Sequence, residues 1–228
     1  DSKLHWTLTS RIVLWATVIL LVGGTLYFLF VEWSNPKTLG PMDFGTKLLS
    51  AFALSVFART AGFNSVDLAA LDPTSWLGTD ILMFIGGGSG GTAGGIKVTT
   101  ATVLIFIVWT EIRGDTAVNI GARRLPRSIQ RQALTLISLA FVTVIGATML
   151  LHLTTPFNTD QLIFEVISAF GTVGVSTGIT PAMPVFGQFV LMALMFIGRL
   201  GTVVVATSLA ARVTHVHYEL PKERPLIG

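Results

Sequence analysis

A long internal repeat is the feature that most constrains the fold of this chain. The stretch Thr60–Ser65, Thr-Ala-Gly-Phe-Asn-Ser, has an echo 112 residues later in Thr172–Thr177, Thr-Val-Gly-Val-Ser-Thr. The same offset, without a gap, superposes the run Met83–Gly86 on Met195–Gly198, and both runs read Met-Phe-Ile-Gly. A repeat of this length predicts that one structural unit is used twice.

Composition predicts that both units lie in a membrane. The chain of 228 residues is 51% hydrophobic and 12% charged, and a soluble domain carries about twice that charged fraction. The uncharged runs Ile12–Val31 and Gln132–Leu151 are each 20 residues long, which matches the hydrocarbon core of a bilayer. The first run is too long for a signal peptide, and more apolar runs follow it. The absence of Cys excludes disulfides and thiolate metal sites.

Each unit is expected to consist of a helix, a short pore helix, an irregular segment and a second helix. In the first unit the helix Ile12–Val31 is followed by a short apolar helix, Phe44–Arg59. Irregular backbone at membrane depth is tolerated only where it is buried in protein or lines a water-filled cavity. The negative end of the short helix would favour a cation in that cavity. The alternative is a surface helix and turn of a soluble protein. The second unit is expected to comprise Gln132–Leu151, Asp160–Gly171, Thr172–Gly178 and Met183–Ala211.

A cluster of glycines interrupts the second helix of the first unit. Residues 86–95, between the apolar runs Trp76–Ile85 and Ile96–Thr110, include seven glycines. Each glycine costs a helix about 1 kcal/mol relative to alanine, so a loop inside the membrane is predicted. The matching run Met183–Ala211 has no such cluster, and we therefore interpret the loop as functional.

Two other interpretations of the glycine loop remain open. A Walker-type phosphate loop requires lysine directly after its last glycine, whereas Ile96 separates Gly95 from Lys97 here. Glycines also let membrane helices approach closely, but such glycines are spaced along one helix face and are not clustered.

The positive charges predict the orientation of the chain. Ten of the 15 Lys and Arg residues lie near the N-terminus, in the hydrophilic linker, or from Arg212 onward. By the positive-inside rule these three regions are expected to be cytoplasmic in the cell membrane. The same distribution argues against nucleic-acid binding. We divide the chain into a unit at 1–112, a linker at 113–131, a unit at 132–212 and a cytoplasmic tail at 213–228.

The Thr-x-Gly stretches suit an ion-selectivity filter. A potassium ion leaves water only if backbone carbonyls replace its hydration shell, and glycine gives the backbone the necessary freedom. Threonine can add a side-chain oxygen. The alternative is that these are ordinary turn glycines. The predicted filter residues are Thr60, Ala61, Gly62, Phe63, Thr172, Val173, Gly174 and Val175, with K+ contacts expected at Thr60, Gly62, Thr172 and Gly174.

With these motifs the chain resembles the Ktr/Trk/HKT superfamily of potassium transporters. The resemblance rests on Arg59–Asn64 and on Ser168–Pro181, and it is strongest to the KtrB type of bacterial membrane subunit. It implies an all-α membrane protein in which four helix–pore loop–helix units surround a pseudo-fourfold pore. This chain would supply the third and fourth units. Its tail Leu220–Gly228 looks like a natural end, whereas Asp1 does not look like a natural start.

The resemblance also implies a gate and partners. The gate would be the loop Gly86, Gly87, Gly88, Ser89, Gly90, Gly91, Thr92, Ala93, Gly94 and Gly95, together with Arg199. Glycine at both visible filter positions favours potassium over sodium. The expected partners are K+, membrane lipid, a KtrA-like nucleotide-binding regulatory ring and a second copy in a homodimer. No covalent cofactor is expected, and a coupling or activating role of Na+ stays open.

Arg199 is a functional candidate in its own right. It lies in the middle of an apolar helix, where a charge is costly, and the repeat offset places it opposite Gly87. We expect it to repel or obstruct cations below the filter. A structural salt bridge with Asp80 or Glu165 is the alternative.

The sequence therefore predicts gated potassium uptake and no enzymatic activity, because no catalytic constellation is present. Two other functions remain open. One is a secondary transporter with a discontinuous helix at its substrate site. The other is a membrane enzyme that binds phosphate at the glycine loop.

Overall fold

The computed structural model describes residues 6–211 apart from 89, 90, 92, 116 and 122, and it describes side chains as far as Leu200. Within these residues the chain is mostly helical, as expected. The helices are α1 (Leu8–Glu32), α2 (Phe44–Phe57), α3 (Pro73–Phe84), α4 (Val98–Arg113), α5 (Arg127–Thr154), α6 (Thr159–Gly171) and α7 (Val185–Ala211). Two 3-10 turns, Leu68–Ala70 and Thr180–Ala182, and the short strands β1 (Asn119–Ile120) and β2 (Arg123–Arg124) complete the fold.

Two of the described helices, α1 and α5, are long and apolar enough to cross a membrane. They contain 25 and 28 residues. Helix α1 begins after Thr7, whose side chain accepts a hydrogen bond from the Ser10 amide at 3.2 Å. Helix α5 begins at Arg127, five residues before the expected start at Gln132, because Pro126 fits the extended position that precedes a first turn. The start was predicted too late because the charged first turn of α5 has the composition of a linker.

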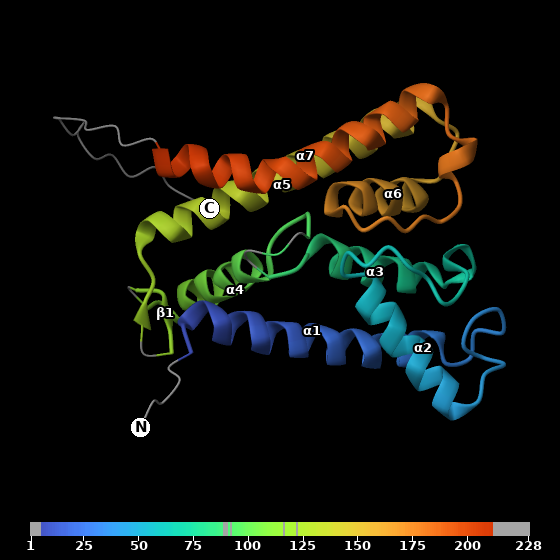
Figure 1. Ribbon diagram of the computed structural model, residues 1–228, viewed down its shortest axis with the longest axis horizontal. Coiled ribbons are helices and arrows are strands. Elements are labelled where there is room, and N and C mark those ends of the chain that lie inside the picture. The colour runs from blue at the N-terminus through green and yellow to red at the C-terminus, as the bar shows by residue number, and fades with distance from the viewer. Residues whose placement is uncertain (1–5, 89–90, 92, 116, 122, 212–228) are drawn as a thin grey trace.

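A small hairpin occupies the expected linker. Strands β1 and β2 pair antiparallel, with Asn119 opposite Arg124 and Ile120 opposite Arg123. The amide of Leu125 donates to the carbonyl of Val118 at 2.8 Å and extends the pairing. The hairpin lies at the same end of the molecule as the starts of α1 and α5 (Figure 1).

The helices form two groups that correspond to the two repeats. In the first group α1 packs against α2, α3 and α4, and in the second α6 packs against α5 and α7. Contacts of α3 with α6 and of α4 with α5 join the groups (Figure 1). Each of the short helices α2 and α6 therefore packs against at least one longer helix of its own group.

A buried carboxylate ties the end of α1 to the start of α3. Glu32 is fully buried, and its oxygens accept hydrogen bonds from Asn35 at 2.7 Å, Thr38 at 2.5 Å and the Asp72 amide at 2.9 Å. The hydroxyl of Ser75 is a fourth donor. A buried charge is tolerated when donors of this kind satisfy it.

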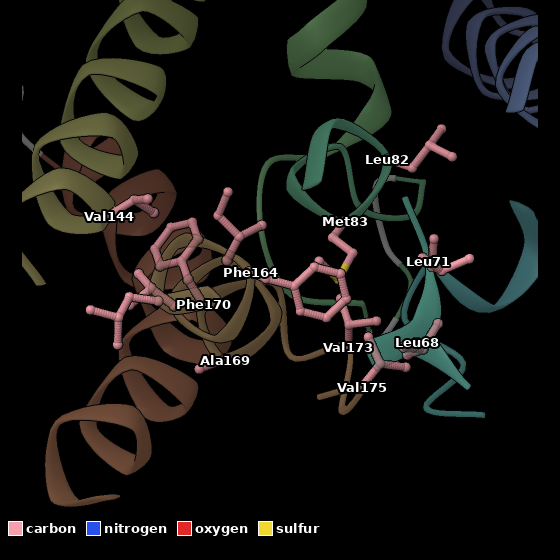
Figure 2. Close-up of a cluster of buried hydrophobic side chains, with 14 of the residues drawn as sticks. Leu68, Leu71, Leu82, Met83, Val144, Phe164, Ala169, Phe170, Val173 and Val175 are labelled. Atoms are coloured by element: carbon pink, nitrogen blue, oxygen red, sulfur yellow. The ribbon is translucent and has the colours of Figure 1, made fainter. Parts of the chain in front are cut away.

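The main apolar core lies between the two groups. Figure 2 shows Val173 and Val175 pointing into the cluster that also contains Leu68 and Met83. Phe164 of α6 is fully buried in the same cluster. The segment that follows α6 is therefore packed into the core and does not loop out into solvent.

Helix α7 touches the end of α6 through a glycine. A Cβ atom on Gly198 would overlap the carbonyl oxygen of Phe170, so only glycine allows this approach. Small residues permit such close contacts between membrane helices. The backbone of α7 thus lies directly against the last turn of α6.

Candidate functional site

The first Thr-x-Gly segment begins where α2 ends. Asp43 caps the other end of this helix by accepting hydrogen bonds from the amides of Gly45 and Thr46. After α2 the backbone turns left-handed at Thr60, with φ 65°, and again at Gly62, with φ 74°. A left-handed threonine is uncommon because its branched side chain crowds the backbone, at a cost of about 1–3 kcal/mol.

The second segment repeats this conformation at the matching positions. Helix α6 ends at Gly171, and the chain is left-handed at Thr172, with φ 52°, and at Gly174, with φ 89°. Among the described residues, Thr60 and Thr172 are the only left-handed residues other than glycine. The sequence repeat is therefore also a repeat of backbone conformation.

The two segments lie side by side. A Cβ atom on Gly62 would lie 3.2 Å from the carbonyl oxygen of Val173. A Cβ atom on Gly174 would lie 3.6 Å from the Cα atom of Gly62. Both glycines are exposed, so within the described part of the chain no side chain covers the backbone at these two positions.

A buried glutamate holds the outer part of the second segment. Glu165 of α6 accepts hydrogen bonds from the Ser176 hydroxyl at 2.6 Å and from the Thr180 hydroxyl at 2.8 Å. It also accepts from the amide and the hydroxyl of Thr177, at 2.8 and 3.1 Å. Several donors aimed at one buried carboxylate fix the segment against α6, the helix that precedes it.

A buried serine holds the middle of the same segment. The hydroxyl of Ser168 donates to the carbonyl of Val175 at 2.5 Å and accepts from the Val175 amide at 3.2 Å. At the repeat offset the first unit has Ala53 in place of Glu165 and Val56 in place of Ser168. Neither side chain can make these hydrogen bonds, so only the second segment has this support.

The glycine loop breaks the helix between α3 and α4, as predicted. Its two ends are joined by a parallel bridge between Ile85 and Ile96. The amide of Gly86 donates to the carbonyl of Ile96 at 2.8 Å, and the amide of Val98 donates to the carbonyl of Gly87 at 3.1 Å. The loop is therefore closed at its base. Of the predicted gate residues, Ser89, Gly90 and Thr92 lie outside the described residues.

The loop touches the start of the second segment. The amide of Gly94 donates to the hydroxyl of Thr172 at 3.1 Å. A Cβ atom on Gly94 would lie 2.5 Å from that hydroxyl oxygen and 2.8 Å from the carbonyl oxygen of Gly171. A Cβ atom on Gly95 would lie 3.3 Å from the Cα atom of Gly171. Close packing of this kind requires glycine at position 94.

Two cations lie near the loop. The ammonium group of Lys97 donates to the carbonyls of Ala93 and, at 3.3 Å, of Gly91. Arg199 of α7 follows Gly198, whose backbone touches the carbonyl of Phe170 at the end of α6. The alternative role for Arg199 was a structural salt bridge with Asp80 or Glu165, and the surroundings of these two carboxyl groups do not favour it. Glu165 is bonded to the second segment, and Asp80 keeps a buried oxygen without a hydrogen-bond partner among the described residues.

The structure thus brings the predicted residues of both segments, the loop and Arg199 into one region. Three more residues contribute to this region in roles that were not predicted from the sequence: Glu165, Ser168 and Lys97. For Glu165 a signal was available, since a charged residue inside an apolar helix is a functional candidate by default.

Comparisons with known proteins identify the family. The profile of the cation transport protein family TrkH matches residues 3–216. The chain belongs to this family. It is 39% identical over 235 aligned residues to the Ktr system potassium uptake protein B of Vibrio alginolyticus, covering all of this chain and 51% of that protein. It is 36% identical over 228 residues to the potassium/sodium uptake protein NtpJ of Enterococcus hirae, covering 97% of this chain and 50% of that protein.

A solved structure has the same fold. The potassium transporter TrkH of Vibrio parahaemolyticus superposes with a TM-score of 0.69 at 19% identity, over 91% of this chain and 44% of that chain. The resemblance expected from the sequence is confirmed at the level of family and helical fold. The chain spans about half the length of the relatives it matches.

Proposed function

We propose that this TrkH-family chain forms part of a potassium-conducting pore in the cell membrane. The observation that carries the proposal is the pair of Thr-x-Gly segments, left-handed at matching residues and side by side at the ends of two short helices. The N–H and C=O groups of backbone in this conformation cannot all be paired with one another, as they are in a continuous helix. Its peptide groups are available to replace the water around an ion.

The relatives support the choice of ion. Two of the similar proteins are named for potassium uptake or for potassium and sodium uptake. Glycine occupies both filter positions that this chain contains, Gly62 and Gly174, which favours potassium in the proposal. Sodium would enter as a coupling or activating ion.

The glycine loop is the proposed gate. It rests on Thr172 through Gly94, directly at the start of the second segment. Lys97 is hydrogen-bonded to the loop, and Arg199 follows the contact of α7 with the end of α6; both charges would repel a cation that leaves the filter. Displacement of the loop would open the passage.

The proposed assembly follows the charge distribution. The start of the chain, the linker at 113–131 and the tail at 213–228 are placed in the cytoplasm. The tail and Arg212 lie outside the described residues. A nucleotide-binding regulatory ring would dock on the basic linker, and the membrane subunit would be a homodimer of complete chains.

The first experiment compares potassium and sodium flux through liposomes that contain the complete parent protein. Gly174→Ser should reduce the preference for potassium by about tenfold or more, because position 174 is left-handed and a side chain there would turn or crowd its peptide groups. Gly146→Ser is the matched control, since a Cβ atom on Gly146 meets nothing within 4 Å. Unchanged selectivity of Gly174→Ser would overturn the filter assignment.

A second candidate function is favoured by the break between α3 and α4. Discontinuous helices form the substrate sites of many secondary transporters, often in inverted repeats. The proposed parallel repeat instead places Ser34, after α1, and Asp115, after α4, on opposite sides of the membrane. Labelling of Ser34→Cys and Asp115→Cys variants with an impermeant thiol reagent tests this. Labelling of both from the same side would exclude the parallel topology.

A further inference from the structure

A groove of about 630 Å³ runs between α1 and α4, away from the filter segments. Apolar side chains of both helices line most of its length. Two arginines, Arg11 at the start of α1 and Arg123 of the hairpin, line the end near the hairpin. The other end reaches Ile85 and Val98, which flank the glycine loop. The groove is therefore apolar along its floor and basic at one end.

Its length fits one leaflet of a bilayer. Along α1 the lining extends from Leu8 to Leu20. At 1.5 Å per residue this is about 18 Å, and one half of a hydrocarbon core about 30 Å thick is about 15 Å. A single acyl chain lying along the helices would therefore fill the groove from its basic end to its inner end.

The basic end fits an acidic headgroup. Within the described residues neither the Arg11 nor the Arg123 guanidinium has a hydrogen-bond or ion-pair partner. Both residues are exposed. Trp6 and Trp15, which are 51% and 65% exposed, line the groove beside them. Tryptophan prefers the level of lipid headgroups, and paired guanidinium groups bind phosphate with several donors.

We propose that the groove binds one anionic phospholipid of the cytoplasmic leaflet. The phosphate lies between Arg11 and Arg123, and one acyl chain lies along α1 and α4. This inference rests on the proposed membrane orientation, which places the hairpin at the cytoplasmic surface. Basic pockets between membrane helices on that side attract acidic headgroups, and the inner leaflet is rich in anionic lipid.

The site adjoins the proposed gate. Ile85 and Val98 contribute to the inner end of the groove and to the closed base of the glycine loop. A Cβ atom on Gly88 of the loop would lie 2.8 Å from a methyl group of Val13 on α1. An acyl chain that fills the groove therefore contacts the residues that hold the loop ends together.

The test measures how much lipid the complete parent protein retains. The protein is incubated with phosphatidylglycerol or phosphatidylcholine, and native mass spectrometry detects the bound lipid. The wild type should retain phosphatidylglycerol about tenfold more readily than phosphatidylcholine. The double variant Arg11→Gln/Arg123→Gln should lose this preference, whereas Arg11→Lys/Arg123→Lys should keep most of it. Ala101→Trp, which fills the groove without changing a charge, should lower the retention of both lipids.

Arg124→Gln is the matched control. Arg124 neighbours Arg123 on β2 and is equally exposed, but it lines a different cavity, beside Asp115 and Arg127. Its lipid retention should equal that of the wild type. Equal retention by all variants would overturn the proposal. Absence of bound lipid in the wild type would also overturn it, because other parts of the complete protein would then fill the groove. Potassium flux is measured separately on each variant, so failure of the proposed conduction does not alter the lipid result.

Discussion

The two Thr-x-Gly segments share a backbone conformation but differ in what holds them. The second segment is anchored to α6 by Glu165 and Ser168, which hydrogen-bond to Val175, Ser176, Thr177 and Thr180. In the first segment the side chain of Asn64 donates only to the nearby Val66 carbonyl, at 3.3 Å. Residues 62–65 of this segment are exposed, whereas positions 173, 175 and 177 of the second are buried.

This difference shows that a repeated conformation does not require a repeated scaffold. In the second unit helix α6 is buried along nearly its whole length and supplies the polar contacts itself. In the first unit Phe63 is 68% exposed and α2 supplies no side chain to the segment at the equivalent positions. The side-chain contact that α2 makes to the first segment is instead apolar, between the rings of Phe57 and Phe63, whose centroids are 6.0 Å apart.

The largest effect is expected from Glu165→Ala in the complete protein. The variant leaves buried donors of the second segment without an acceptor, at about 1–3 kcal/mol for each group. We expect the preference for potassium over sodium to fall at least about tenfold in liposome flux. Asp160→Ala, a change to an exposed carboxylate on the same helix, is the control and should have little effect. Equal effects of the two variants would mean that the polar contacts do not distinguish the segments.

Gly94→Ala tests whether the loop depends on the second segment. The added methyl group would overlap the Thr172 hydroxyl and the Gly171 carbonyl, so the loop should be displaced from its seat. We expect potassium flux to rise several-fold, because the displaced loop obstructs the passage less. Gly91→Ala is the control, since position 91 is exposed and its added atom would meet only the Gly88 carbonyl, at 3.3 Å. A fall in flux to background would contradict a gating role.

Ser168→Ala should have a smaller effect than Glu165→Ala. It removes one side chain that donates to and accepts from Val175, leaving groups whose loss of partners costs about 1–3 kcal/mol. Selectivity should fall several-fold in the same flux measurement. The reciprocal change Val56→Ser in the first unit should leave selectivity unchanged. A similar loss in both variants would remove the distinction between the units.

The smallest effect concerns the N-terminal caps of the two short helices, α2 and α6. The Thr46 hydroxyl, which donates to Asp43 at 2.5 Å, lowers the pKa of this carboxyl below its ordinary value. Because folding lowers the pKa of this carboxyl, its ionised form stabilises the fold at pH values above the ordinary carboxyl pKa, and this contribution is lost as the pH falls through the lowered pKa. Helix α6 has no side-chain cap bond at Asn158.

Amide hydrogen exchange between about pH 3 and pH 5, corrected for the intrinsic pH dependence of exchange, measures this difference. The first turn of α2 should lose slight protection on acidification in the wild type and show no such change in Asp43→Asn. The first turn of α6 should respond in neither protein. If α2 still lost protection on acidification in Asp43→Asn, the pH response would belong to a titratable group other than Asp43.

The sequence predicted the bounds of the short helices well, because each is an apolar run next to a polar cap or a glycine. Helix α2 begins at Phe44 as expected, and α6 begins one residue before Asp160. The start of α5 was placed too late, since Arg127 and Arg131 have the composition of a linker although arginine is a good helix former. The pattern of apolar residues cannot show whether such a charged stretch is a linker or the first turn of a helix.

The support of the second segment was harder to predict than the segment itself. The partners of Glu165 lie 11 to 15 residues further on, at Ser176, Thr177 and Thr180. They meet it only because the chain reverses after α6 and runs back along the helix. Such spacing has no local signal in the sequence. The conducting roles of the Thr-x-Gly residues stay predictions that the flux measurements test.

The contact between Gly198 and the Phe170 carbonyl has a mechanical consequence. Because no side chain cushions it, α7 and the last turn of α6 meet at a hard bearing point. A shift of α7 at this point would press on the peptide group between Phe170 and Gly171, one residue before Thr172. Helix α7 therefore couples mechanically to the start of the second Thr-x-Gly segment, and Arg199 is the residue that follows the contact.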